Sequence, residues 1–352
     1  MSTYELVADL PLTIDDYSFE LLSKAVSSGF ERVSTIIHLR GAGEEGLGED
    51  VTYDAEEHPL QQEHGREHPL AGQWTFDSFS EHVGTLDLFP AGAPRMDVFR
   101  EYRRWGYESA ALDLALRQNG TSLAKILGRE LEPVRFVVSS RMGEPPTIEP
   151  VRRRLARYPK LRFKLDATPD WDDALIAGLV ELGAVDSFDF KGTYKGTPVD
   201  AETDPAFYRR IAETFPDAWL EDPDLDVPEA REALRPFEDR ITWDAPIHSV
   251  QDILDRPVLP RTVNLKPSRF GAVRALFEAY DFCAERGMGA YGGGQFELGV
   301  GRGQIQYLAA MFHADGPNDI APGGYDDLDP EPGLPESPLD PDPDPTGFRR
   351  RS

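Results

Sequence analysis

A regular alternation of short apolar segments and helix-like segments fills the middle of the chain and constrains its fold more than any other feature. The predicted strands are 134–139, 161–165, 185–190, 218–220, 241–243 and 262–265. A predicted helix follows each strand from the second onward, at 171–182, 204–215, 229–237, from 249, and 272–286. Such alternation predicts parallel strands, and at least six units without a glycine-rich phosphate-binding turn favour a closed barrel over a doubly wound sheet.

Local signals indicate where these helices begin and end. Thr168 stands before a proline and is predicted to cap the helix that Gly183 closes. Asp204 precedes another proline and predicts the start of the next helix. Ser249 with Asp252 three residues later approximates a capping box. These signals support the alternation read from the apolar pattern.

The two ends of the chain differ from the middle. Strand-like runs at 4–10 and 33–39 and a long amphipathic helix at 96–118 predict an α+β domain over residues 1–125, before a barrel over 126–315. Residues 316–352 are rich in Pro, Asp and Gly, which excludes a regular helix or a central strand. We expect this tail to pack back on the first domain or to be disordered.

A polar segment at 55–72, inside the predicted α+β domain, contains three histidines. His64 and His68 could face one way on a helix and bind a metal. A solvated loop is the better interpretation, because no cysteine or carboxylate pattern accompanies them.

The charge balance excludes several classes of partner. The chain carries 37 basic and 63 acidic residues, a net charge of −26, which argues against nucleic acid and anionic membranes as partners. No run of 18 apolar residues predicts a membrane helix, and the first residues lack a signal-peptide pattern. The single Cys283 suits a reducing compartment, so we expect a cytoplasmic protein. We also expect a homo-oligomer.

Five consecutive predicted strands end in a charged residue. They are Lys164, Asp189, Glu221, Asp244 and Lys266, each about one strand-helix unit after the last. In a barrel of this type, functional residues gather at the carboxyl ends of the strands. The sequence therefore predicts three neighbouring carboxylates with a lysine on either side.

Three converging carboxylates repel one another unless a cation neutralises them. Oxygen ligands with open positions point to Mg²⁺, with Mn²⁺ as the alternative. Near a metal and another cation the pKa of a lysine falls, so that Lys164 and Lys266 could transfer protons. The chemistry indicated is removal of a proton α to a carboxylate, with the metal stabilising the enediolate.

Each of the five residues also has a simpler explanation. A strand-end acid often caps the next helix or pairs with an arginine, and a strand-end lysine is more often a surface residue. The joint placement on consecutive strands, in a chain with seven lysines, favours the functional interpretation.

The motifs around these residues resemble those of the enolase superfamily, and within it the muconate-lactonizing-enzyme-like subgroup, over nearly the whole chain. RFKLD resembles the Lys-x-Lys strand, with Arg162 in the place of the first lysine and Lys164 in that of the second. Asp189, Glu221 and Asp244 match the three metal ligands. VNLKPSRFG resembles the strand of the opposite lysine, Lys266, and GGGQFELGVGR the glycine-rich strand, with Glu297 at its acidic position.

This resemblance implies an α+β capping domain over a (β/α)7β barrel, a Mg²⁺ ion, two catalytic lysines and a small carboxylate substrate. Subgroup members include cycloisomerases, o-succinylbenzoate synthases, N-acylamino acid racemases and dipeptide epimerases, so it implies an isomerase or a lyase. A histidine base of the mandelate-racemase type is not expected, because His313 falls too late and His248 belongs to a loop.

The sequence departs from the subgroup at several positions. Lys191 follows Asp189 where the family usually has Asn, and it could contact a substrate anion or pair with a neighbouring acid. Arg162, Lys191 and Glu297 are therefore candidate substrate contacts. Asp166 could occupy the first ligand position in another register, which we reject because it leaves an extra strand before Glu221. No Asp-x-Asp pair marks GGGQFELG, which weakens a dipeptide epimerase interpretation.

Two other functions fit the same barrel. One is a Schiff-base aldolase with Lys266 as its nucleophile, which would leave the acid trio unexplained. The other is a non-catalytic barrel that keeps the metal, against which the intact lysine pair argues. Substrate identity is expected to depend on the capping segments 15–28 and 50–57.

Overall fold

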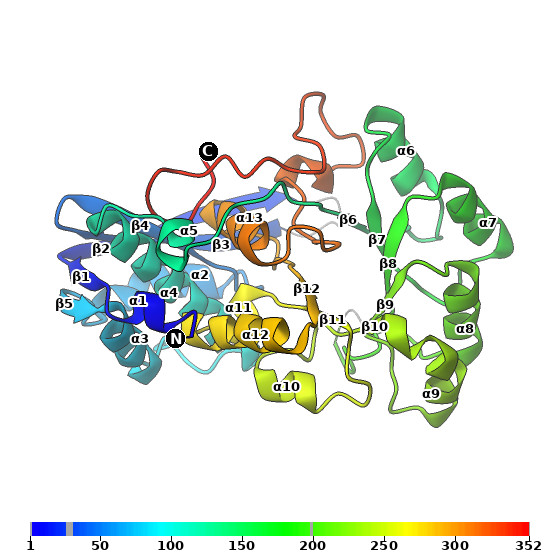
Figure 1. The fold of residues 1–352 in the computed structure, drawn as a ribbon, viewed down its shortest axis with the longest axis horizontal. Helices are drawn as coiled ribbons and strands as arrows, with labels where there is room; N and C mark the ends of the chain where they lie inside the picture. Colours follow the sequence, from blue (N-terminus) through cyan, green and yellow to red (C-terminus); the bar gives the residue numbers. More distant parts are fainter. Residues whose placement is uncertain (1, 26–30, 198–199, 352) are drawn as a thin grey trace.

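The N-terminal domain is built on an antiparallel sheet of three strands, β2 (Asp16–Ala25), β3 (Glu31–Gly41) and β4 (Glu44–Asp50). The computed structural model, shown in Figure 1, describes residues 2–25, 31–197 and 200–351. Helix α4 (Val98–Gln118) packs against β4, where a Cβ atom at Gly48 would overlap the carbonyl oxygen of Gly106. The glycines of β4 thus allow the buried helix to approach the sheet closely.

Smaller elements complete this domain. They are β1 (Pro11–Ile14) and β5 (Gly72–Thr75), which pair antiparallel, with α1 (Glu5–Ala8), α2 (Glu57–His64), the 3-10 helix η1 (Gly65–Glu67) and α3 (Phe76–Thr85). The predicted strand over 4–10 is wrong, because residues 5–8 form α1. Tyr4 and Val7 are both buried, and their spacing of three fits a helix rather than a strand. The predicted strand over 33–39 and helix over 96–118 are confirmed by β3 and α4.

Parallel strands line the second domain, each followed by a helix. The strands are β6 (Val138–Ser140), β7 (Phe163–Asp166), β8 (Val185–Asp189), β9 (Trp219–Glu221), β10 (Ile241–Thr242), β11 (Thr262–Asn264) and β12 (Gly289–Tyr291). The helices are α6 (Glu149–Arg157), α7 (Asp173–Leu182), α8 (Pro205–Thr214), α9 (Pro228–Leu234), α10 (Val250–Leu254), α12 (Val273–Arg286) and α13 (Val300–Phe312). Shorter helical segments are α5 (Leu123–Leu127), η2 (Arg235–Arg240), α11 (Pro267–Phe270) and η3 (Gly323–Asp326). In Figure 1 the helices α6 to α9 lie outside the strands β6 to β10.

Two further connections close these strands into a ring. The N–H of Asn264 donates to the carbonyl of Trp243 at 3.1 Å and links β11 to the end of β10. Asn318 forms a parallel bridge with Phe136, and Asp319 forms one with Gly293, so segment 318–319 lies between the β6 and β12 sides. With this eighth strand segment the domain is a (β/α)7β barrel, and the predicted fold with its α+β capping domain is confirmed.

The predicted helix boundaries are confirmed in part. Asp204 and Ser249 cap α8 and α10 with their side chains, and Gly183 ends α7 with φ of 60°. Asp172, rather than Thr168, caps α7, because residues 168–171 form a separate turn before the helix.

Alternate residues of the barrel strands face opposite ways. Phe188 packs against Trp171 and Phe215, which lie in the outer helical layer. The next residue, Asp189, therefore points into the barrel, since successive side chains of a strand face opposite sides. Fully buried apolar residues between strands and helices, Leu165, Leu220 and Val263 among them, form the core of this layer.

The tail after residue 316 contacts both domains in this structure. Leu339 pairs with Val134 beside the barrel. Farther along, Gly347 pairs with Ser122, and the N–H of the buried Phe348 donates to Asp113 of α4 at 3.2 Å. No helix within the described residues is long and apolar enough to cross a membrane.

Candidate active site

Three carboxylates meet inside the barrel at the carboxyl ends of neighbouring strands. Oxygen atoms of Asp189, Glu221 and Asp244 lie within 4.8 Å of one another, and all three residues are at most 1% exposed. Asp189 is in register with Glu221 across β8 and β9, and Glu221 is in register with Thr242 of β10. Asp244, two residues beyond Thr242, thereby reaches the same cluster.

The two predicted lysines approach this trio from different sides. Lys164 of β7 forms an ion pair with Glu221, and its Nζ lies 3.5 Å from Asp189 and 4.0 Å from Asp244. The Nζ atom of Lys266, just after β11, lies 2.9 Å from Asp244. The structure thus brings together all five strand-end residues that the sequence indicated.

Burial and mutual repulsion make the charge of the trio costly. Burial raises the pKa of Glu221 to about 8, with Asp244 and Asp189 adding to the rise against the opposing effect of Lys164. Burial opposes the charge on Asp189 as well, but Lys191 and Lys164 lower its pKa to about 2. Burial acts against the charge on Lys164 too, yet Glu221, Asp189 and Asp244 raise its pKa well above the usual value.

The trio fits a hard divalent cation. Its donors are carboxylate oxygens, which Mg²⁺ and Mn²⁺ prefer, and a cation would relieve the repulsion that raises the pKa of Glu221. Among the residues that the structure describes, this is the one group of three or more His, Cys, Asp or Glu residues with atoms close enough to share an ion. His64 and His68 are not part of such a group.

Two charged residues that contact Asp244 were not assigned from the sequence. The Nη1 atom of Arg269 lies 2.7 Å from Oδ1 of Asp244, whereas Lys266 contacts Oδ2 of the same carboxylate. Asp222 accepts hydrogen bonds of 2.8 Å from the N–H groups of Asp244 and Ala245, with its own backbone at φ of 50°. The chain thus positions Asp244 through both its side chain and its backbone.

Other polar groups surround Glu221 and Lys164. The hydroxyl of Tyr291, at the end of β12, donates to Glu221. Asp319, on the eighth strand segment, lies 3.7 Å from the Nζ atom of Lys164. A sequence signal for Asp319 is weak, because a segment of two bridged residues in a Pro- and Gly-rich region has no strand pattern.

Lys191 pairs with two acids in this structure. Its Nζ lies 2.5 Å from Asp189 and 3.4 Å from Asp166, and its own N–H donates to Asp189 at 3.0 Å. A φ of 54° places its backbone in the left-handed region, which brings the side chain back toward Asp189. Asp166 contacts this lysine and Arg141 rather than joining the trio.

The structure does not bring Arg162 into the cluster. Its guanidinium pairs with Asp186 at the beginning of β8 and donates to the carbonyl of Gly183. A register shift between Phe163 and Lys164 interrupts the alternation, so that Arg162 and Lys164 do not face the same way. Arg162 lies at the opposite end of the strands from the trio.

Glu297 is buried in the loop after β12. Its carboxylate accepts from the N–H of Gln295 at 2.8 Å and lies 3.8 Å from Arg302. No ion pair joins Glu297 to the trio or to its lysines among the described residues.

The two histidines near the barrel have structural contacts. The ring of His248 bonds to the backbone carbonyls of Arg269 and Ala245. His313 lies 2.7 Å from the side-chain oxygen of Asn318, and burial lowers its pKa to about 4. Neither contacts the trio within the described part of the chain.

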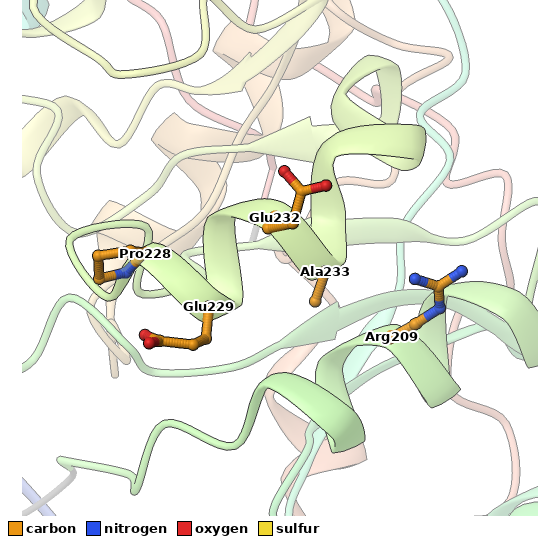
Figure 2. A pocket seen from close by; sticks show the side chains of 5 residues that line it. All are labelled: Arg209, Pro228, Glu229, Glu232 and Ala233. Carbon is orange, nitrogen blue, oxygen red and sulfur yellow. The ribbon is translucent and has the colours of Figure 1, made fainter.

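A shallow hollow lies on the outer surface of the barrel, between α8 and α9. Figure 2 shows its lining residues, Arg209 from α8 and Pro228, Glu229, Glu232 and Ala233 from α9. These elements form the outer helical layer, so the hollow does not open onto the strand ends.

Of the capping segments expected to contact substrate, 15–25 is mostly strand β2, and 26–28 lies outside the described residues. Segment 50–57 connects β4 to α2. It carries Tyr53, whose ring lies 4.5 Å from the guanidinium carbon of Arg32.

Two family models match the chain, one for each domain. They are described as "Domain of unknown function (DUF8230) N-terminal domain", over residues 5–126, and "Domain of unknown function (DUF8230) C-terminal domain", over residues 130–327. The second model covers more than half of the chain.

Curated relatives are similar at lower identity. An o-succinylbenzoate synthase of Bacillus subtilis (strain 168) is 25% identical over 233 residues, 61% of this chain and 58% of the relative. An N-succinylamino acid racemase of Amycolatopsis sp is 28% identical over 313 residues, 84% of this chain and 80% of the relative. The match thus spans less than two thirds of the synthase and most of the racemase.

Solved structures share the fold. An unknown member of the enolase superfamily from Enterococcus faecalis V583 has a TM-score of 0.65 at 21% identity, over 88% of this chain and 86% of the other. Muconate lactonizing enzyme from Pseudomonas fluorescens, complexed with muconolactone, has a TM-score of 0.58 at 20% identity. The match covers 85% of this chain and 83% of that enzyme. The fold of this chain is that of the enolase superfamily, and its curated relatives and structural neighbours support the muconate-lactonizing-enzyme-like subgroup. The chain belongs to the DUF8230 family.

Proposed function

We propose that this protein is an isomerase or a lyase that removes a proton α to a carboxylate of a small substrate and stabilises the resulting enediolate. The observation that carries the proposal is the placement of Lys164 and Lys266 on different sides of one buried acid trio. A proton-transfer group on each side of a reacting carbon is the arrangement that racemisation through two bases requires, and one such group is sufficient for elimination or cycloisomerisation.

Asp189, Glu221 and Asp244 would hold Mg²⁺, or Mn²⁺ as the alternative. When bound, the ion would bind the substrate carboxylate and stabilise the negative charge that develops on it. The donor set supports this assignment, because it consists of buried carboxylates with no nitrogen or sulfur ligand.

The lysines would move the proton at their Nζ atoms. The carboxylates around Lys164 hold its pKa high, so neutralising those carboxylates lowers the pKa and allows the neutral amine to act as a base. Both lysine side chains are at most 8% exposed, which excludes bulk water from the proton being transferred.

The number of active lysines decides the outcome. If Lys164 and Lys266 exchange protons on opposite faces of the carbon, the substrate is racemised or epimerised. If one lysine transfers the proton and the other only stabilises charge, elimination or cycloisomerisation results. The synthase and racemase relatives support these two classes without selecting one.

The net charge of −26 supports a small-molecule substrate over a nucleic acid or an anionic membrane.

Exchange of the α-hydrogen in D₂O tests the proposal. Each enantiomer of an N-succinylamino acid is incubated in D₂O with the purified protein and Mg²⁺. The α-hydrogen signal of the amino acid in proton NMR should decrease with time. Lys164→Ala and Lys266→Ala should each reduce that exchange by at least about 10²-fold, the usual contribution of a general base. Lys160→Ala, at an exposed lysine outside the site, is the matched control and should exchange like the wild type.

Two results would contradict the proposal. One is the absence of exchange across a panel of small carboxylic acids that includes succinylated amino acids and dicarboxylates. The other is exchange that survives in both lysine variants. Trapping of a carbonyl substrate by borohydride, with activity that persists after chelation, would instead support a Schiff-base aldolase that uses Lys266.

A further inference from the structure

The partners of Lys164 fall into two groups. Four carboxylates lie within 4.0 Å of its Nζ in the described part of the chain, and Glu221, Asp189 and Asp244 belong to the trio. The fourth, Asp319 at 3.7 Å, does not. Asp319 thus differs from the other three carboxylates, because it can still pair with Lys164 when the trio binds a cation.

The position of Asp319 is fixed by the barrel. Its N–H donates to the carbonyl of Gly292 at 2.8 Å, and its bridge with Gly293 is part of the connection that closes the strand ring. Its side chain is 19% exposed, whereas those of the trio are at most 1% exposed. The carboxylate therefore lies at the edge of the cluster, on a rigid backbone, beside the lysine.

A cation at the trio changes what Lys164 can contact. A divalent ion and an ammonium group repel each other strongly at short range in a buried site, and both compete for the oxygens of Glu221 and Asp189. The ammonium must weaken those contacts, and its remaining neighbour is Asp319. A short movement of a flexible side chain is sufficient, because the Nζ already lies 3.7 Å away.

We propose that Asp319 is a positioning residue that holds Lys164 beside the trio when a divalent cation is bound, and that this contact strengthens cation binding. The inference rests on the proposed function in one respect, namely that the trio binds the cation. Asp319 itself does not contact the cation and acts through Lys164. It keeps the Nζ atom of Lys164 in the site instead of allowing the side chain to leave.

A second lysine of the cluster offers an internal comparison. Lys191 also contacts one trio carboxylate, Asp189, and one carboxylate outside the trio, Asp166. No ion pair joins Asp166 to Lys164 among the described residues. Removal of the Asp166 charge should therefore affect cation binding in a way that does not depend on Lys164.

A double-mutant cycle tests the proposal with Mn²⁺ as the probe, measured by isothermal titration of the full chain. Asp319→Asn should weaken Mn²⁺ binding about tenfold in the wild-type background, within the usual range for coupled sites. In a Lys164→Met background the same substitution should change the affinity by less than about twofold, because the group that it acts through is gone. Asp319→Glu keeps the carboxylate and should restore binding to within about twofold.

The control variant separates this coupling from a general loss of negative charge. Asp166→Asn should have the same effect on Mn²⁺ affinity with and without Lys164. If Asp319→Asn also has equal effects in both backgrounds, or has no effect, the positioning role is overturned. Circular dichroism tests whether each variant is folded. If Asp319→Asn is not folded, Asp319→Ser replaces it in both backgrounds.

Failure of the proposed function gives a different result. If Glu221→Gln binds Mn²⁺ as tightly as the wild type, the trio is not the cation site, and both the proposed function and this inference are overturned. If Glu221→Gln loses binding while the Asp319 cycle shows no coupling, the proposed function stands and this inference is overturned.

Discussion

The carboxylate of Glu49, in β4 of the N-terminal domain, accepts a hydrogen bond of 2.9 Å from the backbone N–H of Gly301, at the start of barrel helix α13. The same carboxylate accepts from the N–H groups of Leu298 at 2.7 Å and Gly299 at 3.0 Å, and from the hydroxyl of Ser34. The first domain thus caps a helix of the second, with side-chain oxygens that accept from the N–H groups at the start of that helix.

We expect Glu49→Ala to reduce the free energy of unfolding by about 3 kcal/mol, because several buried N–H groups lose their acceptor. Glu49→Gln should cost less, since one side-chain oxygen remains. Urea unfolding measures both changes. A loss below about 0.5 kcal/mol in the Ala variant would show that water or another group replaces the carboxylate.

Mg²⁺ should raise the melting temperature of the protein, and EDTA should reverse the change. Ligand at a hundred times its dissociation constant stabilises the folded state by about 2.7 kcal/mol, which corresponds to several degrees in a chain of this size. Differential scanning fluorimetry with and without Mg²⁺ measures the shift. Glu221→Gln should abolish it, and an unchanged shift in that variant would place the ion elsewhere.

His313 should make stability depend on pH in acid. Burial lowers its pKa from 6.5 to about 4, so above pH 6.5 the histidine is neutral in both folded and unfolded states. As pH falls from 6.5 to 4, only the unfolded state takes up the proton, and about 3 kcal/mol of stability is lost before the effect levels off.

His313→Asn, which keeps a donor for Asn318, removes this titration. Its free energy of unfolding, measured in urea at successive pH values, should approach that of the wild type as pH falls from 6.5 to 4. A difference between the two proteins that stays constant over this range would contradict the assignment.

Phe348→Ala should detach the end of the tail from α4. The ring is fully buried and makes an edge contact with Tyr307 at 6.5 Å between centroids, so its removal should cost about 3 to 5 kcal/mol. Limited proteolysis should then cut within residues 340–347 faster than in the wild type. Arg351→Ala, at an exposed position, is the control, and equal cleavage of both variants would indicate that the ring does not anchor the tail.

The central site could be predicted because strand ends are visible in the sequence. Lys164, Asp189, Glu221, Asp244 and Lys266 each lie within or directly after a predicted strand, and parallel strands bring such positions to one edge. The pattern could not show the register shift in β7, which separates Arg162 from the cluster. A bulge changes the facing of a side chain without changing the residues that surround it in sequence.

Other features depended on contacts between distant parts of the chain. Asp319 belongs to a strand segment only because Gly293 and Phe136 flank that segment, and the second lies more than 180 residues away. Asp172 caps α7 although Thr168 precedes a proline, because the turn at 168–171 delays the helix. Local patterns identified the elements, while the pairing partners set their boundaries and their roles.

The contact between Asp113 and Phe348 also bears on the order of folding during synthesis. The two residues are separated by 235 positions, so α4 leaves the ribosome long before its tail partner, by roughly 10 to 50 s at ordinary rates of translation. During that interval the Asp113 carboxylate has its helical neighbour Arg117 but not Arg349 of the tail. The nascent N-terminal domain therefore leaves the Asp113 carboxylate uncovered by the tail until the whole barrel has been made.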